Sequence, residues 1–218
     1  NGVTAFADMY VFEDQTAQAV ADTGIRASLS RAVVSGEGED ARFAEAQALY
    51  DTWHGKAEGR IRTMMAAHAV YTCADTTLMR VCNMAKEMGT PIHIHISETK
   101  KEVADCIKAH GKTPVRYLSD LGFFDAPTLA AHCVHVDEAD MDILKTYDVH
   151  VAHNPVSNLK LGSGIAPVPQ MLKKGICVAL GTDGASSNNN LSVLRELREA
   201  ALIHKGAAMD PTLVTACQ

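Results

Sequence analysis

Several features are absent from this sequence of 218 residues, and each absence excludes a class of protein. No apolar run approaches the roughly 20 residues that a membrane-spanning helix needs. No basic stretch is long enough to form a nucleic-acid surface, and the net charge is -6. We therefore expect a protein whose partners include neither a membrane nor a nucleic acid.

The six cysteines form no C-x-x-C pair, so a structural zinc knuckle is not expected. They are scattered through apolar segments instead. Such a distribution is typical of reduced, mostly buried thiols and predicts a cytoplasmic protein. The six are Cys73, Cys82, Cys106, Cys133, Cys177 and Cys217.

The composition predicts an ordinary folded domain. A hydrophobic fraction of 47% is enough for a substantial core, and the length fits one domain over residues 1–218. The chain opens on Asn1-Gly2-Val3 instead of a methionine and stops after Cys217-Gln218 without a helix-capping signal. We therefore expect the sequence to be a piece of a longer protein.

Short apolar runs typical of strands alternate along the chain with segments typical of helices. This alternation predicts an α/β fold with a parallel sheet. The strands are expected at residues 3–8, 25–34, 61–67, 92–96, 129–133, 149–152 and 176–180. The helices are expected at residues 12–22, 40–56, 75–88, 99–110, 113–120, 138–147, 165–174 and 191–204.

Two parallel architectures fit this pattern, a doubly wound open sheet and a (β/α)8 barrel. No Gly-x-Gly-x-x-Gly follows the first strand, so the dinucleotide-binding fold lacks its main sequence cue. Polar residues at the ends of many strands favour the barrel. A closed barrel needs eight strands and only seven are predicted here. We therefore expect a (β/α)8 barrel that lacks its first strand and its C-terminal part.

Four polar residues stand at or just beyond the ends of predicted strands. They are His95, Glu98, His132 and Asp183. In a barrel of parallel strands the C-terminal strand ends converge on one face, where catalytic residues collect. Two imidazoles and two carboxylates brought together there predict a divalent metal site with a general base.

Each of these motifs also has a structural interpretation. His93 and His95 point to the same side of a strand, and two buried histidines can be satisfied by backbone groups alone. His95, three residues before Glu98, is the better candidate for a metal ligand, and His93 is expected to pack inside the barrel. Asp183, flanked by glycines, also fits a turn or a helix cap.

Three further residues are candidates for substrate binding. His68 follows the third predicted strand and is placed to orient a substrate. Arg31 can bind an anionic or hydroxyl group, with a surface salt bridge as the alternative. Asn154 opens a loop rich in amides and hydroxyls, for which turn formation is the alternative to substrate hydrogen bonding.

Three longer segments of the sequence resemble the amidohydrolase superfamily. They are Ala131-His-Cys-Val-His135, residues 151–168 (VAHNPVSNLKLGSGIAPV) and residues 179–191 (ALGTDGASSNNNL). The strongest resemblance is to its branch of 5-methylthioadenosine/S-adenosylhomocysteine deaminases and their triazine-hydrolase relatives. It runs from Gly2 to about Lys205, and the stretch after His153 is specific to that branch.

The resemblance implies a mononuclear Zn2+ or Fe2+ site in a (β/α)8 barrel. His95 and Asp183 match metal ligands of the family. His132 matches a histidine that touches the attacking water or the substrate, and it stands beside these two as a further candidate ligand. Glu98 matches the residue that carries protons to the leaving amine. His68 resembles the histidine that helps to hold the nucleoside.

The resemblance also implies a reaction, the hydrolytic deamination of an adenine nucleoside. A metal-activated water with a pKa near ~7 would attack C6 of the ring. Glu98 would protonate the ring nitrogen, and Asp183 would act as a base toward the water. Ammonia would then leave and an inosine-type product would remain.

Two alternatives stay open at this point. The substrate can be another N-heterocycle, such as guanine, cytosine or a triazine. The chain can also be an inactive barrel fragment, because the H-x-H pair that supplies two metal ligands in the first strand of the family is not in this sequence. Members of the family are often oligomeric, and open sheet edges favour self-association, so a homo-oligomer is expected.

Overall fold

The computed structural model describes all of residues 1–218. The chain divides into two compact units. Unit 1 comprises residues 1–2, 95–120 and 129–218, and unit 2 comprises residues 3–94 and 121–128. The single domain expected over residues 1–218 stays a prediction. None of the helices combines the length and the apolar character that crossing a bilayer requires.

Unit 2 is built on parallel strands around β2. The strand β2 pairs in parallel with β1, β3 and β4. The strands are β1 (Ala5–Tyr10), β2 (Arg26–Val33), β3 (Ile61–Thr63) and β4 (Met65–Ala69). The helices are α1 (Glu13–Thr23), α2 (Glu39–Trp53) and α3 (Asp75–Met88), with short 3-10 turns η1 (Val70–Thr72) and η2 (Phe123–Asp125).

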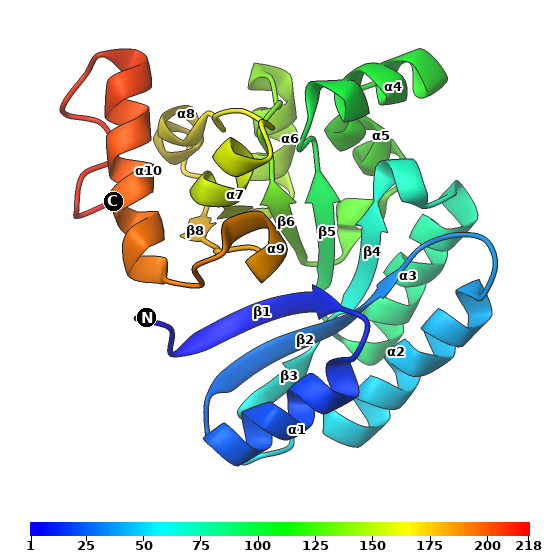
Figure 1. Cartoon of the computed structure of the whole chain (residues 1–218). Coiled ribbons are helices and arrows are strands. Elements are labelled where there is room, and N and C mark those ends of the chain that lie inside the picture. Colours follow the sequence, from blue (N-terminus) through cyan, green and yellow to red (C-terminus); the bar gives the residue numbers. More distant parts are fainter. The chain divides into compact units, whose positions relative to one another are not determined.

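The core of unit 2 lies between its first helices and these strands. Val20 of α1 and Leu49 of α2 pack with Leu29 of β2 and Ile61 of β3, all of them buried. Figure 1 shows α1 and α2 lying alongside β2 and β3. Burial of these apolar side chains is the main stabilising term for the unit.

The strand predicted over residues 61–67 is in fact two strands, so the structure has eight strands and not seven. The first, β3, pairs with β2 at residues 27–29, and β4 pairs with β2 further along at Ala32 and Val33. Met64 lies between them and donates its N–H to the Leu29 carbonyl at 2.9 Å. A continuous apolar run does not reveal such a change of pairing. It also follows that His68 lies within β4 and not in a loop after the strand.

Unit 1 contains the ends of the later strands. The strands β6, β7 and β8 pair in parallel in that order. They are β6 (Thr128–His132), β7 (His150–His153) and β8 (Val178–Leu180), and β5 (Ile92–Ile96) ends in this unit. The helices are α4 (Lys100–His110), α5 (Pro114–Asp120), α6 (Glu138–Thr146), α7 (Pro155–Lys160), α8 (Val168–Lys173), α9 (Ala185–Asn188) and α10 (Val193–Ala208).

The helix starts in unit 1 follow capping chemistry. The Thr99 side chain caps α4, and Asp137 forms a capping box with Asp140 at the start of α6. The helix predicted at residues 165–174 is shorter, because Pro167 is its N-cap and the chain before it is irregular. The short helices α7 and α9 were not predicted.

Candidate active site

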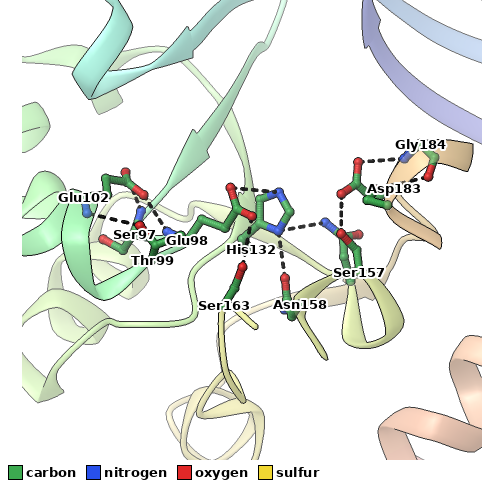
Figure 2. A network of polar contacts seen from close by, with 12 residues as sticks. Ser97, Glu98, Thr99, Glu102, His132, Ser157, Asn158, Ser163, Asp183 and Gly184 are labelled. Atoms are coloured by element: carbon green, nitrogen blue, oxygen red, sulfur yellow. Dashed lines mark hydrogen bonds and ion pairs between the residues drawn. The ribbon is translucent and has the colours of Figure 1, made fainter. Parts of the chain in front are cut away.

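Three of the predicted site residues meet where β5 and β6 end. His95 lies in β5, Glu98 follows that strand, and His132 is the last residue of β6. The rings of His95 and His132 have their centroids 5.4 Å apart. The Glu98 Oε2 atom lies 4.0 Å from His132 Nε2 (Figure 2). The structure therefore brings two imidazoles and one of the two predicted carboxylates together where β5 and β6 end, and the roles of these side chains stay predictions.

The backbone at these strand ends is in the left-handed region. The φ angles are 51° at Ser97, 73° at His132, 46° at Cys133 and 59° at Asp183. Non-glycine residues adopt this region at a cost of about 1–3 kcal/mol each, and such residues cluster at functional sites. Left-handed backbone recurs at the ends of β5, β6 and β8, which supports a candidate functional site at these strand ends.

His132 is fixed by two asparagines. The ring is 3% exposed. Its Nδ1 atom lies 2.9 Å from Asn158 Oδ1 and 3.5 Å from Asn154 Nδ2. Asn154 follows β7 directly and Asn158 lies in α7, so the segment after β7 sets the orientation of the ring.

Asp183 follows β8 and accepts two hydrogen bonds. The Ser157 hydroxyl donates to Oδ2 at 2.5 Å, and the Gly184 N–H donates to Oδ1 at 2.6 Å (Figure 2). Partial desolvation opposes ionisation, but these hydrogen bonds outweigh it and hold the pKa of Asp183 below its usual value. Asp183 is therefore a carboxylate at neutral pH.

Glu98 is held through both its backbone and its side chain. The Glu102 carboxylate accepts the N–H groups of Ser97 at 2.9 Å and Glu98 at 2.7 Å. The Ser163 hydroxyl donates to Glu98 Oε1 at 3.1 Å (Figure 2). Burial raises the pKa of Glu102, and the N–H groups it accepts oppose that shift. The first turn of α4 and the loop after α7 thus position Glu98 together.

A buried histidine pair lies in the same unit. His153 at the end of β7 and His204 of α10 have their Nε2 atoms 3.2 Å apart. Burial and the neighbouring His204 and His132 rings lower the pKa of His153 to about 3. His153 is therefore neutral and joins α10 to β7.

The donor set for a metal is only partly assembled. His95, His132 and Asp183 offer imidazole and carboxylate groups, which suit Zn2+ and Fe2+. However, no three or more His, Cys, Asp or Glu side chains of the chain are grouped so that they could hold a metal ion. The residues present therefore do not form a complete metal site, and the ligand roles of these three stay predictions.

The predicted substrate-binding residues are placed in different units. Asn154 lies in unit 1 beside His132, whereas His68 and Arg31 belong to unit 2. The His68 Nδ1 atom lies 2.9 Å from Thr72 Oγ1. Arg31 is a residue of β2 and pairs with Glu45 at 2.5 Å, which fits the salt-bridge alternative. A substrate role for each of the three stays a prediction.

Four residues of the site were missed from the sequence. Each is a partner of a predicted residue and not itself the end of a strand. Two signals pointed toward them: three lie in the segment of residues 151–168 that carries the family resemblance and includes the loop rich in amides and hydroxyls, and the fourth ends a Thr-x-x-Glu capping box at the start of a predicted helix. They are Glu102, Ser157, Asn158 and Ser163.

Comparison with known proteins gives a consistent result. The model of the amidohydrolase family matches residues 1–217. A curated protein of Thermoanaerobacter pseudethanolicus (strain ATCC 33223 / 39E), named 5-methylthioadenosine/S-adenosylhomocysteine deaminase, is 51% identical over 100% of this chain and 51% of its own length. The chain thus spans about half the length of the curated relatives it matches.

Solved structures show the same fold. An adenosine deaminase from Xanthomonas campestris with bound zinc has a TM-score of 0.93 at 34% identity, covering 99% of this chain and 50% of that one. An atrazine chlorohydrolase from Arthrobacter aurescens TC1 complexed with zinc has a TM-score of 0.86 at 27% identity, covering 97% and 51%. These likenesses confirm the predicted α/β fold with the parallel strands of a (β/α)8-type barrel.

Proposed function

We propose, since this chain belongs to the amidohydrolase family, that it carries catalytic residues of a hydrolase that deaminates an adenine nucleoside of the S-adenosylhomocysteine or 5-methylthioadenosine type. The observation that carries the proposal is the meeting of Glu98, His132 and His95 at the ends of β5 and β6. The names of the curated relatives support this choice of substrate.

The reaction needs three proton or group movements, and the chain offers residues for them. Water adds its oxygen to C6 and loses both of its protons in turn, one to a ring nitrogen and one to the amino group, which leaves as ammonia. Glu98, whose Oε2 faces His132, is placed to carry the proton to the ring and then to the leaving group. Asp183 is ionised and can accept the proton of the water. His132 Nε2 is placed to contact the substrate.

A divalent metal is part of the proposal. The family and the zinc-bound neighbours support one metal ion, and we propose Zn2+ with Fe2+ as the alternative. His95 and Asp183 are the proposed ligands from this chain, and His132 is the further candidate, whose Nε2 atom would then bind the metal instead of contacting the substrate. Imidazole and carboxylate are ordinary ligands of both metals, which supports this choice.

The direct test is turnover by the complete protein in its metal-loaded form. We expect ammonia release from S-adenosylhomocysteine, 5-methylthioadenosine or adenosine, and little from guanine, cytosine or a triazine. Glu98→Gln should lower kcat by roughly 10²- to 10⁴-fold, the usual contribution of a general acid. Turnover of guanine, cytosine or a triazine instead would favour the alternative hypothesis, a hydrolase of another N-heterocycle. Absence of turnover with every substrate would refute the proposed function, whereas turnover by the complete protein but not by the 218-residue chain alone would mark the chain as an inactive barrel fragment.

The remaining partner and location are also proposals. We expect the substrate to be a small nucleoside or N-heterocycle. We also expect the protein to be cytoplasmic and to form a homo-oligomer. The six free cysteines support the cytoplasm, because disulfides are rare there. Light scattering coupled to size-exclusion chromatography would test the oligomer, and a monomer at micromolar concentration would contradict it.

A further inference from the structure

Glu98 and His132 each have one polar atom engaged within the chain and one that faces the other residue. Glu98 Oε1 accepts the Ser163 hydroxyl at 3.1 Å, and His132 Nδ1 lies 2.9 Å from Asn158 Oδ1. The remaining atoms, Glu98 Oε2 and His132 Nε2, are 4.0 Å apart (Figure 2). Ser163 and Asn158 thus determine that Glu98 Oε2 and His132 Nε2 are the atoms available to act on a substrate.

The two partners also belong to one linked segment. The Ser163 N–H donates to the Asn158 carbonyl at 2.8 Å, so the hydroxyl and the amide are fixed relative to each other. The Ser163 carbonyl is further held by His135 Nε2 at 2.7 Å. Asn158 is 1% exposed and Ser163 is 6% exposed, so water does not compete strongly for either contact.

We propose that Ser163 and Asn158 are positioning residues that together turn Glu98 Oε2 and His132 Nε2 toward the substrate. Asn158 also fixes the His132 tautomer with its proton on Nδ1. The positioning role rests on the proposed function, because it assumes that Glu98 and His132 act on a substrate. The tautomer is a property of the folded protein and does not depend on turnover.

The tautomer follows from the contacts of Asn158. The Oδ1 atom can only accept, so the facing Nδ1 must donate and Nε2 keeps its lone pair. The Asn154 Nδ2 atom is also near Nδ1 but at the longer distance of 3.5 Å, so the shorter contact decides. The Asn158 Nδ2 atom is buried and has no hydrogen-bond partner. Replacing the amide by a carboxylate therefore removes no hydrogen bond from the chain.

Kinetics of the complete, metal-loaded protein tests the role of Ser163. We expect Ser163→Ala to lower kcat by roughly 10- to 100-fold with KM changed less than about threefold, since a loosened carboxylate loses its productive orientation. Ser163→Thr, which keeps the hydroxyl, should restore most of kcat. Thr90→Val is the matched control, because the Thr90 hydroxyl is also buried without a partner but lies in unit 2, outside the site. Equal kcat values for Ser163→Ala and Thr90→Val would overturn the role of Ser163.

Histidine-selective 15N NMR of the complete protein tests the role of Asn158 without any turnover. We expect His132 to carry its proton on Nδ1 in the parent protein and in Asn158→Asp, and to lose this preference in Asn158→Leu. A proton on Nε2 in the parent protein, or an unchanged tautomer in Asn158→Leu, would overturn the assignment. A parent protein without deaminase activity would refute the proposed function, while the tautomer result would still stand.

Discussion

At the residue scale, the site depends on a close approach of backbone to side chain at Gly181. A Cβ atom added there would overlap the Asn154 Oδ1 atom. Asn154 is buried and its Nδ2 faces His132. Only glycine leaves room for the Asn154 side chain at this position. Gly181 therefore affects the orientation of His132 through Asn154.

We predict that Gly181→Ala destabilises the protein by about 1–3 kcal/mol, the usual cost of overpacking a filled site, and lowers kcat. Urea unfolding of the complete protein and steady-state kinetics would measure both effects. Gly206→Ala is the control, because nothing lies within 4 Å of a Cβ there and the position is inside α10. That change should be neutral or stabilise by about 0.5–1 kcal/mol. A similar loss of stability in both variants would contradict the packing argument.

The predicted residues and their partners differ in how visible they are in a sequence. His95, Glu98 and His132 were identified because a residue at the end of an apolar run is a local feature. The partners Ser157 and Ser163 were not, because many serines follow strands and only the fold selects which hydroxyl meets which carboxylate. The contact between Gly181 and Asn154 is equally invisible for the same reason.

At the element scale, the turn from β1 into α1 contains an unusual carboxyl group. Glu13 opens α1, is 2% exposed and accepts the Tyr10 N–H at 3.0 Å. Its Oε2 atom is buried without a partner. Burial, with a contribution from the charge of Asp8, raises the pKa of Glu13 to about 7.

This raised pKa predicts a pH-dependent stability. The folded state binds the Glu13 proton more tightly than the unfolded state, so stability falls as pH rises from about 4.5 to about 7. The loss should reach about 3 kcal/mol at most. Glu13→Gln should remove most of this slope and stabilise the protein above pH 7. Denaturant unfolding at a series of pH values would measure it.

The control for this prediction is Glu37→Gln. Glu37 is exposed in the loop before α2, so its replacement should leave the pH dependence as it is in the parent protein. If Glu13→Gln retained the full slope between pH 5 and pH 7, the dependence would have another source and the assignment to Glu13 would be wrong.

The start of α4 supports a second prediction at this scale. Glu102→Ala should destabilise the protein by about 1–3 kcal/mol, because two N–H groups lose their acceptor. It should also lower kcat, since one of those groups belongs to Glu98. Glu138→Ala, an exposed ion-pair residue in the first turn of α6, should change stability by less than about 1 kcal/mol. Thermal unfolding of both variants would decide, and equal shifts would contradict the prediction.

Element boundaries were predictable where local chemistry sets them. The bounds of α3 and β5 agree with the prediction, since periodicity and the turn residues Gly89 and Pro91 define them locally. The division of residues 61–67 into β3 and β4 was missed because it depends on pairing with β2. The short helix α7 was missed because six residues carry too little periodicity to be recognised.

At the scale of the whole molecule, the buried cysteines report on how the two units unfold. Cys73 and Cys82 are buried in unit 2, and Cys106 and Cys133 are buried in unit 1. The other two cysteines are exposed. Burial raises the thiol pKa values of all four buried cysteines, that of Cys106 to about 11, which slows their reaction further.

We predict that a thiol-alkylating reagent modifies only the two exposed cysteines of the native protein. If residues 1–218 form a single domain, the four buried thiols should become reactive together at one denaturant concentration. Mass spectrometry of alkylated peptides along a urea series would measure the modified fraction of the two buried thiols of each unit. Exposure of one pair before the other would show that the units unfold separately.

Metal binding by the chain alone is also a property of the whole molecule. A catalytic zinc site usually has three protein ligands, and the chain groups no three donors. We therefore expect the 218-residue chain to retain much less than one equivalent of zinc after dialysis. Elemental analysis would measure it. A full equivalent that is lost on Asp183→Asn would show that the chain rearranges to complete the site.

The segment that follows β7 connects three strand ends through a few consecutive residues. Ser157 reaches Asp183, Asn158 reaches His132, and Ser163 reaches Glu98. Because these contacts share one short stretch of backbone, substitutions within it should be epistatic, the effect of each depending on the others. In mutant libraries we would expect this stretch to change as a block.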